Sequence, residues 1–508
     1  MALLLTALLG FLAKSAYAAN RPTVDTTSGP VTGLVNRTTP NVAQFLGIPF
    51  AETPTGSLRF LPPKAKSRVN HIDATRFGHS CPQAEPAAPN VWSVDAPNFV
   101  IPANTTGEDC LVVNVWAPSK HSSSKQLLPV IVWIHGGGFQ TGGGNIPYHD
   151  PSLWIERSQK HIVISINYRL NIFGFPNAAG LKDGERNVGL LDLRLGMEWI
   201  KANIVNFGGD PRRINLWGQS AGAIAVDYYN FAYPKDPIAQ SYIMNSGSAL
   251  LPIGSVDPQH TNFTFVASYF GCSGTPEAEL ACFQKVPFAD ITSFLKTYND
   301  AGTTPALSFS PVVDERTKFS NYTARALAGD FSKRPAIMGT VVNEGESFLP
   351  YDQANGPNIT LAQGFTLNFF LCPVVKTVSN RYAESVPTWR YLYAGNFSNI
   401  SPQKWEGAYH QAELPLIFGT HDITDKRSTK FEYAVSHKMQ DYWFAFASDP
   451  VKGLPKLGWE KYTPKGEAVL VGQEGVVSQP IKESALEAPC DGQVGKPGAV
   501  PPGASPPS

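Results

Sequence analysis

The chain has 508 residues, of which 43% are hydrophobic and 16% are charged, and its formal net charge at pH 7 is zero. This composition is typical of a globular protein, and the length allows two domains or one large domain with insertions. The sequence has no run of five or more like charges. Nucleic acid and anionic membrane surfaces are therefore not expected as partners, because both are bound through basic patches.

The N-terminus has the composition of a secretory signal peptide. An apolar stretch runs from Leu3 to Ala13, and the small residues Ala16 and Ala18 stand at the spacing of a cleavage site. The stretch is too short to span a membrane, although no Lys or Arg precedes it. We therefore expect residues 1–18 to be a signal peptide and the mature protein to be secreted.

Cysteines and glycosylation sequons fit an oxidising, extracellular location. The six cysteines form an even set without a Cys-x-x-Cys pair, which favours three disulfides over a metal or redox site. Asn-x-Ser/Thr sequons mark seven candidate glycosylation sites: Asn36, Asn104, Asn262, Asn321, Asn358, Asn396 and Asn399.

Short apolar segments alternate with helical patterns along the chain. Each segment ends in small or polar residues, as strands covered on both faces of a sheet do. The apolar faces of 187–207 and 427–447 predict helices. This alternation, without a strong internal linker, predicts one α/β domain over residues 19–490 with a largely parallel sheet, and functional residues at the carboxyl ends of its strands. The expected strands are 128–137, 161–170, 214–220, 241–248, 334–345 and 388–395.

Three glycines, Gly136 to Gly138, follow the first of these strands. Backbone amides can approach a substrate carbonyl closely only where no side chain intervenes, so these glycines are typical of an oxyanion hole. A plain flexible turn is the alternative. A phosphate-binding loop is disfavoured because no Gly-Lys-Ser/Thr follows. The neighbouring His135 is expected to be structural.

The strand expected at 214–220 runs into a Gly-x-Ser-x-Gly pentad, Gly218 to Gly222, and then into a helical pattern. With 44 glycines in the chain, the pentad alone could arise by chance. Between a strand and a helix, however, two glycines allow the sharp turn that exposes the central serine. The sequence therefore predicts Ser220 as a nucleophile rather than an ordinary turn serine, and a serine hydroxyl needs an adjacent base.

Several residues could supply the base and the acid that such a serine requires. His410 lies downstream in a polar loop, and His421 and His437 are its rivals. Glu344 ends an apolar segment between the serine and His410, while Asp314 and Glu346 occupy comparable positions. A buried carboxylate is needed to hold the imidazole and to stabilise the imidazolium. Spacing favours His410 and Glu344 without excluding the others.

The C-terminal residues 491–508 are rich in proline and glycine, which predicts a disordered tail. The tail lacks the apolar end that a lipid-anchor signal requires. No segment after the N-terminus approaches 18 consecutive apolar residues. We therefore expect no integral association with a membrane.

The chain resembles the type-B carboxylesterase/lipase family of α/β-hydrolases, which includes cholinesterases and fungal lipases. The resemblance extends from about Val31 to Cys490. Seven segments carry it in order: FLGIPFAETPTGSLRFLPP, GEDCLVVNVWAP, VWIHGGGF, INYRLNIFGF, NVGLLDLRLGMEWIKANIVNFGGDP, GQSAGA and MQDYWFAFASDP.

The resemblance implies an α/β-hydrolase fold, with a central, mostly parallel β-sheet covered by helices on both faces and with large loop and helical insertions. It implies Ser220 as the nucleophile, Glu344 as the acid and His410 as the general base. It also implies that no metal or organic cofactor is needed. The oxyanion would be held by the backbone N–H groups of Gly137, Gly138 and Ala221.

The family pattern further implies cross-links between distant segments. Each disulfide would stabilise the fold by roughly 2–4 kcal/mol. The implied disulfides are Cys81–Cys110, Cys272–Cys282 and Cys372–Cys490, and the implied buried ion pairs are Arg59–Glu108 and Arg169–Asp192.

Some positions depart from the cholinesterase pattern. Val100 stands where those enzymes bind the choline cation with a tryptophan, and Trp92 is out of register with it. Gln219 precedes the serine where cholinesterases place a glutamate. Pro305 and Leu307 replace acyl-pocket aromatics, which leaves room for a larger acyl group. These departures predict that choline esters are not the substrate.

The sequence thus predicts a secreted serine hydrolase that cleaves a small-molecule or lipid ester through an acyl-enzyme. A histidine base acts only when neutral, so activity is expected to fall below about pH 6. One alternative is a true lipase with interfacial activation, although residues 82–109 have too few apolar positions and too many prolines for a large lid. Another is a catalytically inactive, cholinesterase-like adhesion protein. The oligomeric state and the physiological ester are not predicted.

Overall fold

The structure, a computed structural model, describes residues 21–102, 104–120 and 126–490. The predicted signal peptide, 1–18, and the predicted tail, 491–508, lie outside the described residues. The boundaries of the predicted domain therefore stay predictions.

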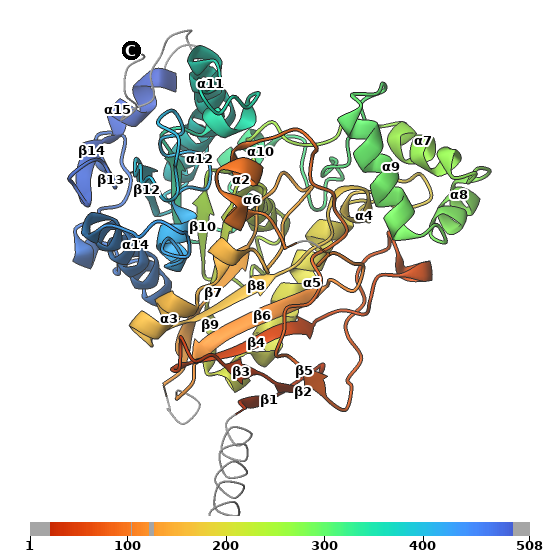
Figure 1. Ribbon diagram of the computed structural model, residues 1–508, viewed down its shortest axis with the longest axis horizontal. Coiled ribbons are helices and arrows are strands. Elements are labelled where there is room, and N and C mark those ends of the chain that lie inside the picture. Colours follow the sequence, from red (N-terminus) through yellow and green to blue (C-terminus); the bar gives the residue numbers. More distant parts are fainter. Residues whose placement is uncertain (1–20, 103, 121–125, 491–508) are drawn as a thin grey trace, which may run out of the picture.

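One long sheet runs through the described part of the molecule (Figure 1). Its strand order is β14-β13-β12-β11-β10-β9-β7-β8-β6-β4-β3. Neighbouring strands from β8 to β13 are parallel, whereas β3, β4, β6 and β14 pair antiparallel toward the two edges. The bounds are β3 Leu34–Val35, β4 Val42–Pro49, β6 Val112–Pro118, β7 Leu128–Ile134, β8 Ile162–Ile166, β9 Gly209–Gln219, β10 Ser241–Asn245, β11 Ala336–Val341, β12 Thr388–Tyr393, β13 Glu467–Val471 and β14 Ser478–Lys482.

The six strands expected from the sequence form the parallel centre of this sheet, as β7 to β12. Successive side chains of a strand point to opposite faces. In β7, Val130, Val132 and Ile134 enter one apolar core, whereas Ile131 and Trp133 enter another. Both faces of the sheet are therefore covered, and the predicted α/β-hydrolase architecture is confirmed.

A second, smaller sheet lies beside the β3–β4 edge (Figure 1). It consists of β1 (Thr23–Thr26), β2 (Gly29–Thr32) and β5 (Ile72–Asp73). β1 and β2 pair antiparallel, while β2 and β5 are parallel. This sheet lies at the opposite end of the molecule from α11 (Figure 1).

Helices cover both faces of the long sheet. Met197 of α5 and Val226 of α6 enter the core on one face, and Leu416 of α13 and Trp443 of α14 enter the core on the other. The helices expected at 187–207 and 427–447 are present as α5, continued by η5, and as α14. The α-helices are α2 Val91–Val94, α3 Ser152–Ser158, α4 Asn171–Gly174, α5 Val188–Asn203, α6 Ala221–Ala232, α7 Thr261–Tyr269, α8 Pro276–Phe283, α9 Phe288–Asp300, α10 Tyr322–Leu327, α11 Ile359–Phe365, α12 Cys372–Ala383, α13 Leu414–Phe418, α14 Lys430–Ser448 and α15 Glu483–Glu487. Short 3-10 helices are η1 Gly56–Leu58, η2 Pro97–Phe99, η4 Pro147–His149, η5 Ile204–Phe207, η6 Gly345–Phe348, η8 Pro455–Leu457 and η9 Ala488–Cys490, and η7 Thr366–Leu371 is a π-helix.

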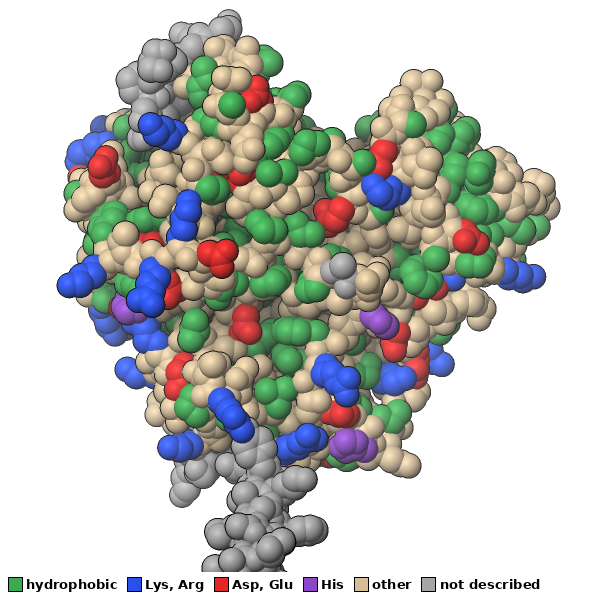
Figure 2. All heavy atoms as spheres, viewed as in Figure 1, with side chains coloured by type: hydrophobic (Ala, Val, Ile, Leu, Met, Phe, Trp, Pro, Cys, Tyr) green, Lys and Arg blue, Asp and Glu red, His purple; other side chains and the backbone are tan. Residues whose placement is uncertain are grey.

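Helices α7, α8 and α9 form a lobe at one side of the molecule (Figure 1). The lobe has its own apolar core, in which the Phe60 ring lies 5.4 Å from Phe263 and 5.5 Å from Phe283 between ring centroids. Figure 2 shows a notch between this lobe and the rest of the molecule. On the face drawn there, charged side chains of both signs are interspersed without a large area of one sign.

Disulfides and buried ion pairs join distant segments. Arg59 binds Glu108 at 2.5 and 2.7 Å, and Arg169 binds Asp192 at 2.7 and 2.8 Å. All four side chains are buried, so removing one partner would leave an unpaired charge inside the protein. These are the ion pairs that the family pattern implies. The three disulfides that the family pattern implies are also present: Cys81–Cys110, Cys272–Cys282 and Cys372–Cys490.

One helical run of the described chain, Ile359–Ala383, is long and apolar enough to cross a membrane by length and composition. It combines α11, η7 and α12. Phe370, Val374 and Val378 of this run are buried in the core that includes α5 and α6. A core helix of a folded domain meets the same criteria, so the run is weak evidence for a membrane segment.

Candidate active site

Ser220 lies on the tight turn between β9 and α6. Its φ of 56° and ψ of −128° fall in a region that non-glycine residues rarely adopt. A Cβ on Gly218 would collide with the backbone of Gly222, and a Cβ on Gly222 would collide with the carbonyl of Ile134. Strand, turn and helix thus approach so closely that only glycine fits at both positions. The pentad holds Ser220 at the carboxyl end of a central parallel strand.

The glycine loop that follows β7 lies against this turn. A Cβ on Gly136 would lie 2.9 Å from the Cβ of Ser220, and Gly137 and Gly138 have φ values of 100° and 63°. Among the described residues, the backbone N–H groups of Gly137, Gly138 and Ala221 donate no hydrogen bond. Three unpaired N–H groups near a serine can bind the oxygen of a carbonyl that becomes negative during attack.

His410 and Glu344 meet through a short backbone pairing. A β-bridge between Asn343 and Tyr409 sets the two following residues side by side. Oε2 of Glu344 lies 2.5 Å from Nδ1 of His410, and its Oε1 accepts the N–H of Val341 at 3.0 Å. Both side chains are at most 1% exposed. The carboxylate holds the imidazole with its proton on Nδ1, which leaves Nε2 free to accept another proton.

Gln219 contacts the other ring nitrogen of His410. The Nε2 atoms of the two residues lie 3.0 Å apart, so the amide of Gln219 donates to the unprotonated nitrogen. Among the described residues, the hydroxyl of Ser220 makes no hydrogen bond to His410. Catalytic hydrogen bonds are often long or absent before substrate binds. Proton transfer from Ser220 to His410 would therefore require His410 to exchange the amide for the serine hydroxyl.

The other candidates for base and acid have different partners. Nδ1 of His421 lies 2.7 Å from a serine hydroxyl, and His437 is exposed on α14. The Asp314 carboxylate accepts backbone N–H groups of the turn that follows it. Glu346 accepts a hydrogen bond from the Asn343 amide at 2.7 Å. None of these four residues lines the pocket described below.

Two more buried carboxyl groups lie near Glu344. Burial, reinforced by the charge of Glu344, raises the pKa of Glu346 to about 7 and that of Glu413 to about 8. In slightly acidic solution both groups are largely protonated, so they add little charge beside the imidazole. No group of three His, Cys, Asp or Glu side chains in the described chain is arranged to hold a metal ion.

His135, beside the glycine loop, supports that loop. Its Nδ1 lies 2.9 Å from the carbonyl oxygen of Gly136, and its ring stacks on Tyr168 with a centroid distance of 4.6 Å. Burial lowers the pKa of His135 to about 4. A neutral, packed ring of this kind fits the structural position expected from the sequence.

A pocket of about 290 Å³ opens beside these groups, which is at the small end of the range for ligand sites. Ser220 and His410 line it together with Gly136, Gly137 and Gly138. The remaining wall is mainly apolar and comes largely from the segment between Cys81 and Cys110. Its apolar side chains include Trp92, Phe99, Val100, Ile101, Ile146 and Phe348.

Trp92, although out of register with the cholinesterase tryptophan, lies in this wall. Its ring centroid is 6.4 Å from that of His410, and Phe348 and Phe370 lie 4.9 and 4.7 Å from the same imidazole. Three aromatic rings therefore enclose His410. One feature of the sequence could have pointed to this wall. Asn90 is a favoured N-cap residue, and it caps the helical turn α2 that presents Trp92.

The two acyl-pocket positions lie farther from Ser220. Leu307 lines a neighbouring hollow beside α9, and Pro305 is exposed. The hollow shares Gln140 and Thr141 with the catalytic pocket, so the two spaces adjoin. A larger acyl group at these positions stays a prediction.

The predicted glycosylation sites differ in accessibility. Asn262 is half-buried, and its amide donates to the Ser308 carbonyl at 3.1 Å. The amide of Asn399 is also half-buried and makes three hydrogen bonds, to His421, Ser428 and Glu432. The exposed sequon residues are Asn36, Asn104, Asn321, Asn358 and Asn396.

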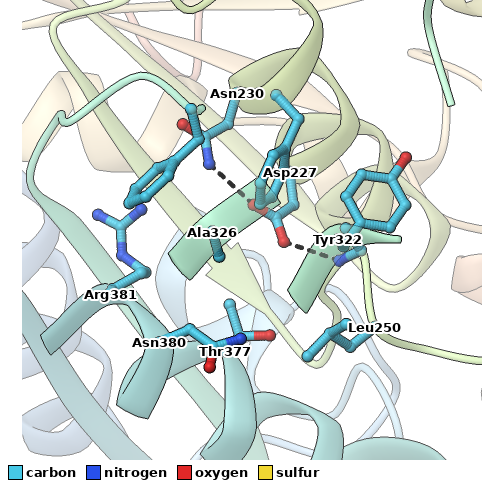
Figure 3. Close-up of a pocket in the computed structure, with 11 residues that line it drawn as sticks. Asp227, Asn230, Leu250, Tyr322, Ala326, Thr377, Asn380 and Arg381 are labelled. Carbon is cyan, nitrogen blue, oxygen red and sulfur yellow. Dashed lines mark hydrogen bonds between the residues drawn. The ribbon is translucent and has the colours of Figure 1, made fainter. Parts of the chain in front are cut away.

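A separate small cavity lies between α6, α10 and α12 (Figure 3). Asp227 accepts hydrogen bonds from the Asn230 amide at 3.0 Å and from the Ala249 N–H at 2.7 Å, and Arg381 approaches from α12. Burial raises the pKa of Asp227. None of the predicted catalytic or oxyanion-hole residues lines this cavity, so its polar groups belong to helix packing.

Comparison with known proteins agrees with the fold. A model of the carboxylesterase family matches residues 20–362 and 352–488. The chain is 43% identical to a chlorogenic acid esterase of Aspergillus niger over 437 residues, which cover 85% of this chain and 84% of the relative. It is also 43% identical to secreted lipase 5 of Gibberella zeae over 502 residues, 92% and 93% of the two chains. An acetylcholinesterase of Bungarus fasciatus is 28% identical over 517 residues, 90% and 84% of the two chains.

A complete family match and two relatives above 40% identity leave no ambiguity about the class of protein. The relatives named above at 43% identity are an esterase and a lipase, and both names denote ester hydrolysis. The chain belongs to the carboxylesterase family and is a carboxylic ester hydrolase.

Proposed function

We propose that the protein is a secreted serine esterase in which Ser220, His410 and Glu344 form the catalytic triad. The observation that carries this proposal is the arrangement in one pocket wall of a serine on a strained turn and a histidine held by a buried glutamate. Secretion rests on the apolar N-terminal segment and on the fungal relative named as a secreted lipase.

The reaction follows from the positions of these groups. Nε2 of His410 takes the hydroxyl proton as Oγ of Ser220 attacks the ester carbonyl carbon. The carbonyl oxygen becomes negative and is bound by the N–H groups of the glycine loop and of Ala221. His410 then donates its proton to the leaving alcohol, and the acyl group stays on Ser220. Water, deprotonated by His410, attacks the acyl-enzyme and releases the acid, while Glu344 stabilises the imidazolium in both steps.

We expect esters of short or compact acyl groups to be better substrates than esters of long chains. The segment 82–109 forms only the single turn of α2 and the short η2, and its apolar side chains Trp92, Phe99 and Ile101 face the pocket. A lipase lid needs a larger apolar surface to bind an oil–water interface. The relative named as a chlorogenic acid esterase makes esters of compact acids the first substrates to test.

The alternative of an inactive adhesion protein finds less support. All three triad side chains are present, and the N–H groups of the proposed oxyanion hole are unpaired. A catalytically inactive protein would not require this arrangement of triad side chains and unpaired N–H groups.

A series of p-nitrophenyl esters with acyl chains from two to sixteen carbons separates esterase from lipase. We expect kcat/KM to be highest for the short chains and to show no jump when the substrate exceeds its solubility. A maximum at about ten carbons or more, together with activation at the interface, would identify a true lipase instead.

A further inference from the structure

A second hollow, of about 550 Å³, lies next to the catalytic pocket, and Ile146 lines both spaces. Its wall contains Phe77, Leu153 and Ile423, which are 38%, 44% and 44% exposed. Single exposed apolar side chains are common on folded proteins, whereas a group of them around one hollow marks a binding surface. The proposed triad and oxyanion-hole residues do not line this hollow.

Three separate segments supply these apolar side chains. Phe77 follows β5, Leu153 lies on α3, and Ile423 lies between α13 and α14. The ring of Phe77 packs near buried Trp116, with 6.1 Å between the centroids. A side chain that is already packed loses little conformational entropy when a ligand covers its remaining surface.

The chemistry of the wall restricts what the hollow can bind. Of the described residues that line it, only Asp150 has an ionisable side chain, and this carboxylate accepts the N–H of Ser152 at 2.8 Å and the hydroxyl of the same residue. A phosphate or a strongly charged peptide would find no free opposite charge there. The amide of Gln44 and the hydroxyl of Thr38 share the wall with the apolar side chains. A sugar, which has hydroxyl groups and apolar C–H faces, matches this mixture.

Asn36, the asparagine of an Asn-x-Thr sequon, also lines the hollow. Its Oδ1 accepts the N–H and the hydroxyl of Thr38, both at 3.2 Å, while its Nδ2 makes no hydrogen bond within the described chain. Nδ2 is the atom to which an N-linked glycan is attached. The same atoms of Asn262 and Asn399 donate to groups of the protein. A glycan on Asn36 would therefore cost the folded protein no hydrogen bond.

We propose that an N-linked glycan on Asn36 occupies this hollow and that its first sugars cover Phe77, Leu153 and Ile423. The occupant is thus a glycan of the chain itself. The pair of N-acetylglucosamine units at the base of such a glycan has the size of a drug-like ligand, and the hollow of about 550 Å³ lies in the range of sites for such ligands. This inference rests on the proposed secretion, because glycans are attached in the secretory pathway, and it is independent of the esterase activity.

The attachment is a glycosyl transfer from a lipid-linked oligosaccharide diphosphate. Nδ2 of Asn36 attacks C1 of the first N-acetylglucosamine, and the C1–O bond to the diphosphate breaks. The new N–C1 bond replaces one N–H bond, and a base of the transferase takes the proton. The lipid diphosphate leaves with the electron pair of the broken bond, so no oxidant or reductant is needed.

The first measurement tests for the glycan itself. The protein is secreted from a eukaryotic host and mapped by peptide mass spectrometry, before and after peptide-N-glycosidase F in heavy-oxygen water. We expect the Asn36 peptide to carry N-acetylhexosamine and hexose, and to contain a labelled aspartate after the enzyme has acted. An unmodified Asn36 peptide in the secreted protein would overturn the proposal.

The second measurement tests whether the glycan occupies the hollow. The same enzyme releases the Asn36 glycan from the native protein and from the unfolded chain, and the ratio of the two rates reports protection. We expect release from the native wild type to be about tenfold or more slower. Leu153→Ser and Ile423→Ser should each restore at least about threefold of that rate, because they weaken the contact with the sugars. Leu361→Ser, at an exposed leucine of α11 outside the hollow, is the matched control and should leave the ratio unchanged.

Removal of the glycan should uncover the apolar wall. We expect Asn36→Gln to increase the fluorescence of the apolar dye ANS by about twofold or more. Asn104→Gln and Asn396→Gln, at exposed sequons that do not line the hollow, should leave the signal unchanged. Cleavage of one soluble ester by all these variants should stay at the wild-type rate.

The remaining outcomes would overturn the proposal in distinct ways. Equally fast release from the native protein and the unfolded chain would show that the glycan leaves the hollow open. Slow release that neither Leu153→Ser nor Ile423→Ser changes would mean that another surface protects the glycan. A dimer that dissociates in Leu153→Ser would assign the hollow to a second copy of the chain. Retention of the protein inside the cell would contradict the proposed secretion and the glycan together, whereas a glycosylated wild type without ester cleavage would contradict the esterase assignment alone.

Discussion

At the scale of single residues, two neighbouring glycines of the loop after β7 have unequal roles. Gly137 has a φ of 100°, and a Cβ there would collide with the carbonyl of Thr141. A Cβ on Gly138, whose φ is 63°, would meet no atom within 4 Å. Alanine at 138 therefore costs only the strain of a left-handed backbone, whereas alanine at 137 must displace the loop.

We expect Gly137→Ala to lower kcat by about 10²-fold or more, because the displaced loop withdraws N–H groups from the oxyanion. Gly138→Ala is the matched control and should keep kcat within about tenfold. Steady-state kinetics on one soluble ester measure both. Equal losses in the two variants, or wild-type kcat in Gly137→Ala, would contradict the assignment of this loop.

The site residues differ in how far the sequence could predict them. Ser220 follows from the pentad and its flanking strand and helix, because local chemistry determines the turn. His410 and Glu344 could be favoured only by order along the chain and by resemblance. Their contact depends on the pairing of Asn343 with Tyr409, two segments separated by more than sixty residues in the chain.

At the scale of elements, a buried carboxyl links helix α13 to the central sheet. Glu413 precedes α13 and is fully buried, and its Oε1 accepts the amide N–H of Asn245 on β10 at 3.0 Å. Burial raises the pKa of Glu413 from 4.5 to about 8. The folded protein therefore holds a proton that the unfolded chain releases above about pH 4.5.

This proton makes stability depend on pH. The contribution of Glu413 is fully present below about pH 4.5 and is lost as pH rises toward 8, because the unfolded chain ionises first. We expect Glu413→Gln, which keeps the acceptor oxygen and cannot ionise, to raise the Tm relative to wild type at pH 7.5 and to leave it nearly unchanged at pH 4.5. The exposed Glu474→Gln is the control and should match wild type at both pH values. Equal Tm differences at the two pH values would contradict the buried, protonated state of Glu413.

The elements themselves were unequally predictable. The six central strands are continuous apolar segments because both faces of each are covered, and that pattern is local. The edge strands β3 and β14 are short and only partly buried, so their pairing depends on the neighbouring strand rather than on their own composition. The lobe of α7 to α9 depends on Phe60, which lies about 200 residues upstream of those helices. A contact between residues so far apart in the chain produces no periodic pattern in the sequence from which it could be predicted.

At the scale of the whole molecule, the parallel sheet brings the proposed catalytic groups together at the carboxyl ends of its central strands. Ser220, Glu344 and the glycine loop each follow the carboxyl end of a parallel strand: β9, β11 and β7. The segment from Cys81 to Cys110 then closes the pocket with aromatic side chains. In the proposed mechanism, the sheet positions the reacting groups, and the segments outside it form most of the wall that an ester would meet.

The central claim is that Ser220 becomes covalently acylated. The most direct measurement is the intact mass of the folded protein after reaction with an organophosphate that mimics the tetrahedral intermediate, followed by peptide mapping. We expect one adduct per chain, located on Ser220, and none in Ser220→Ala. A wild-type protein that hydrolyses esters without forming this adduct, or an adduct that persists in Ser220→Ala, would contradict the account.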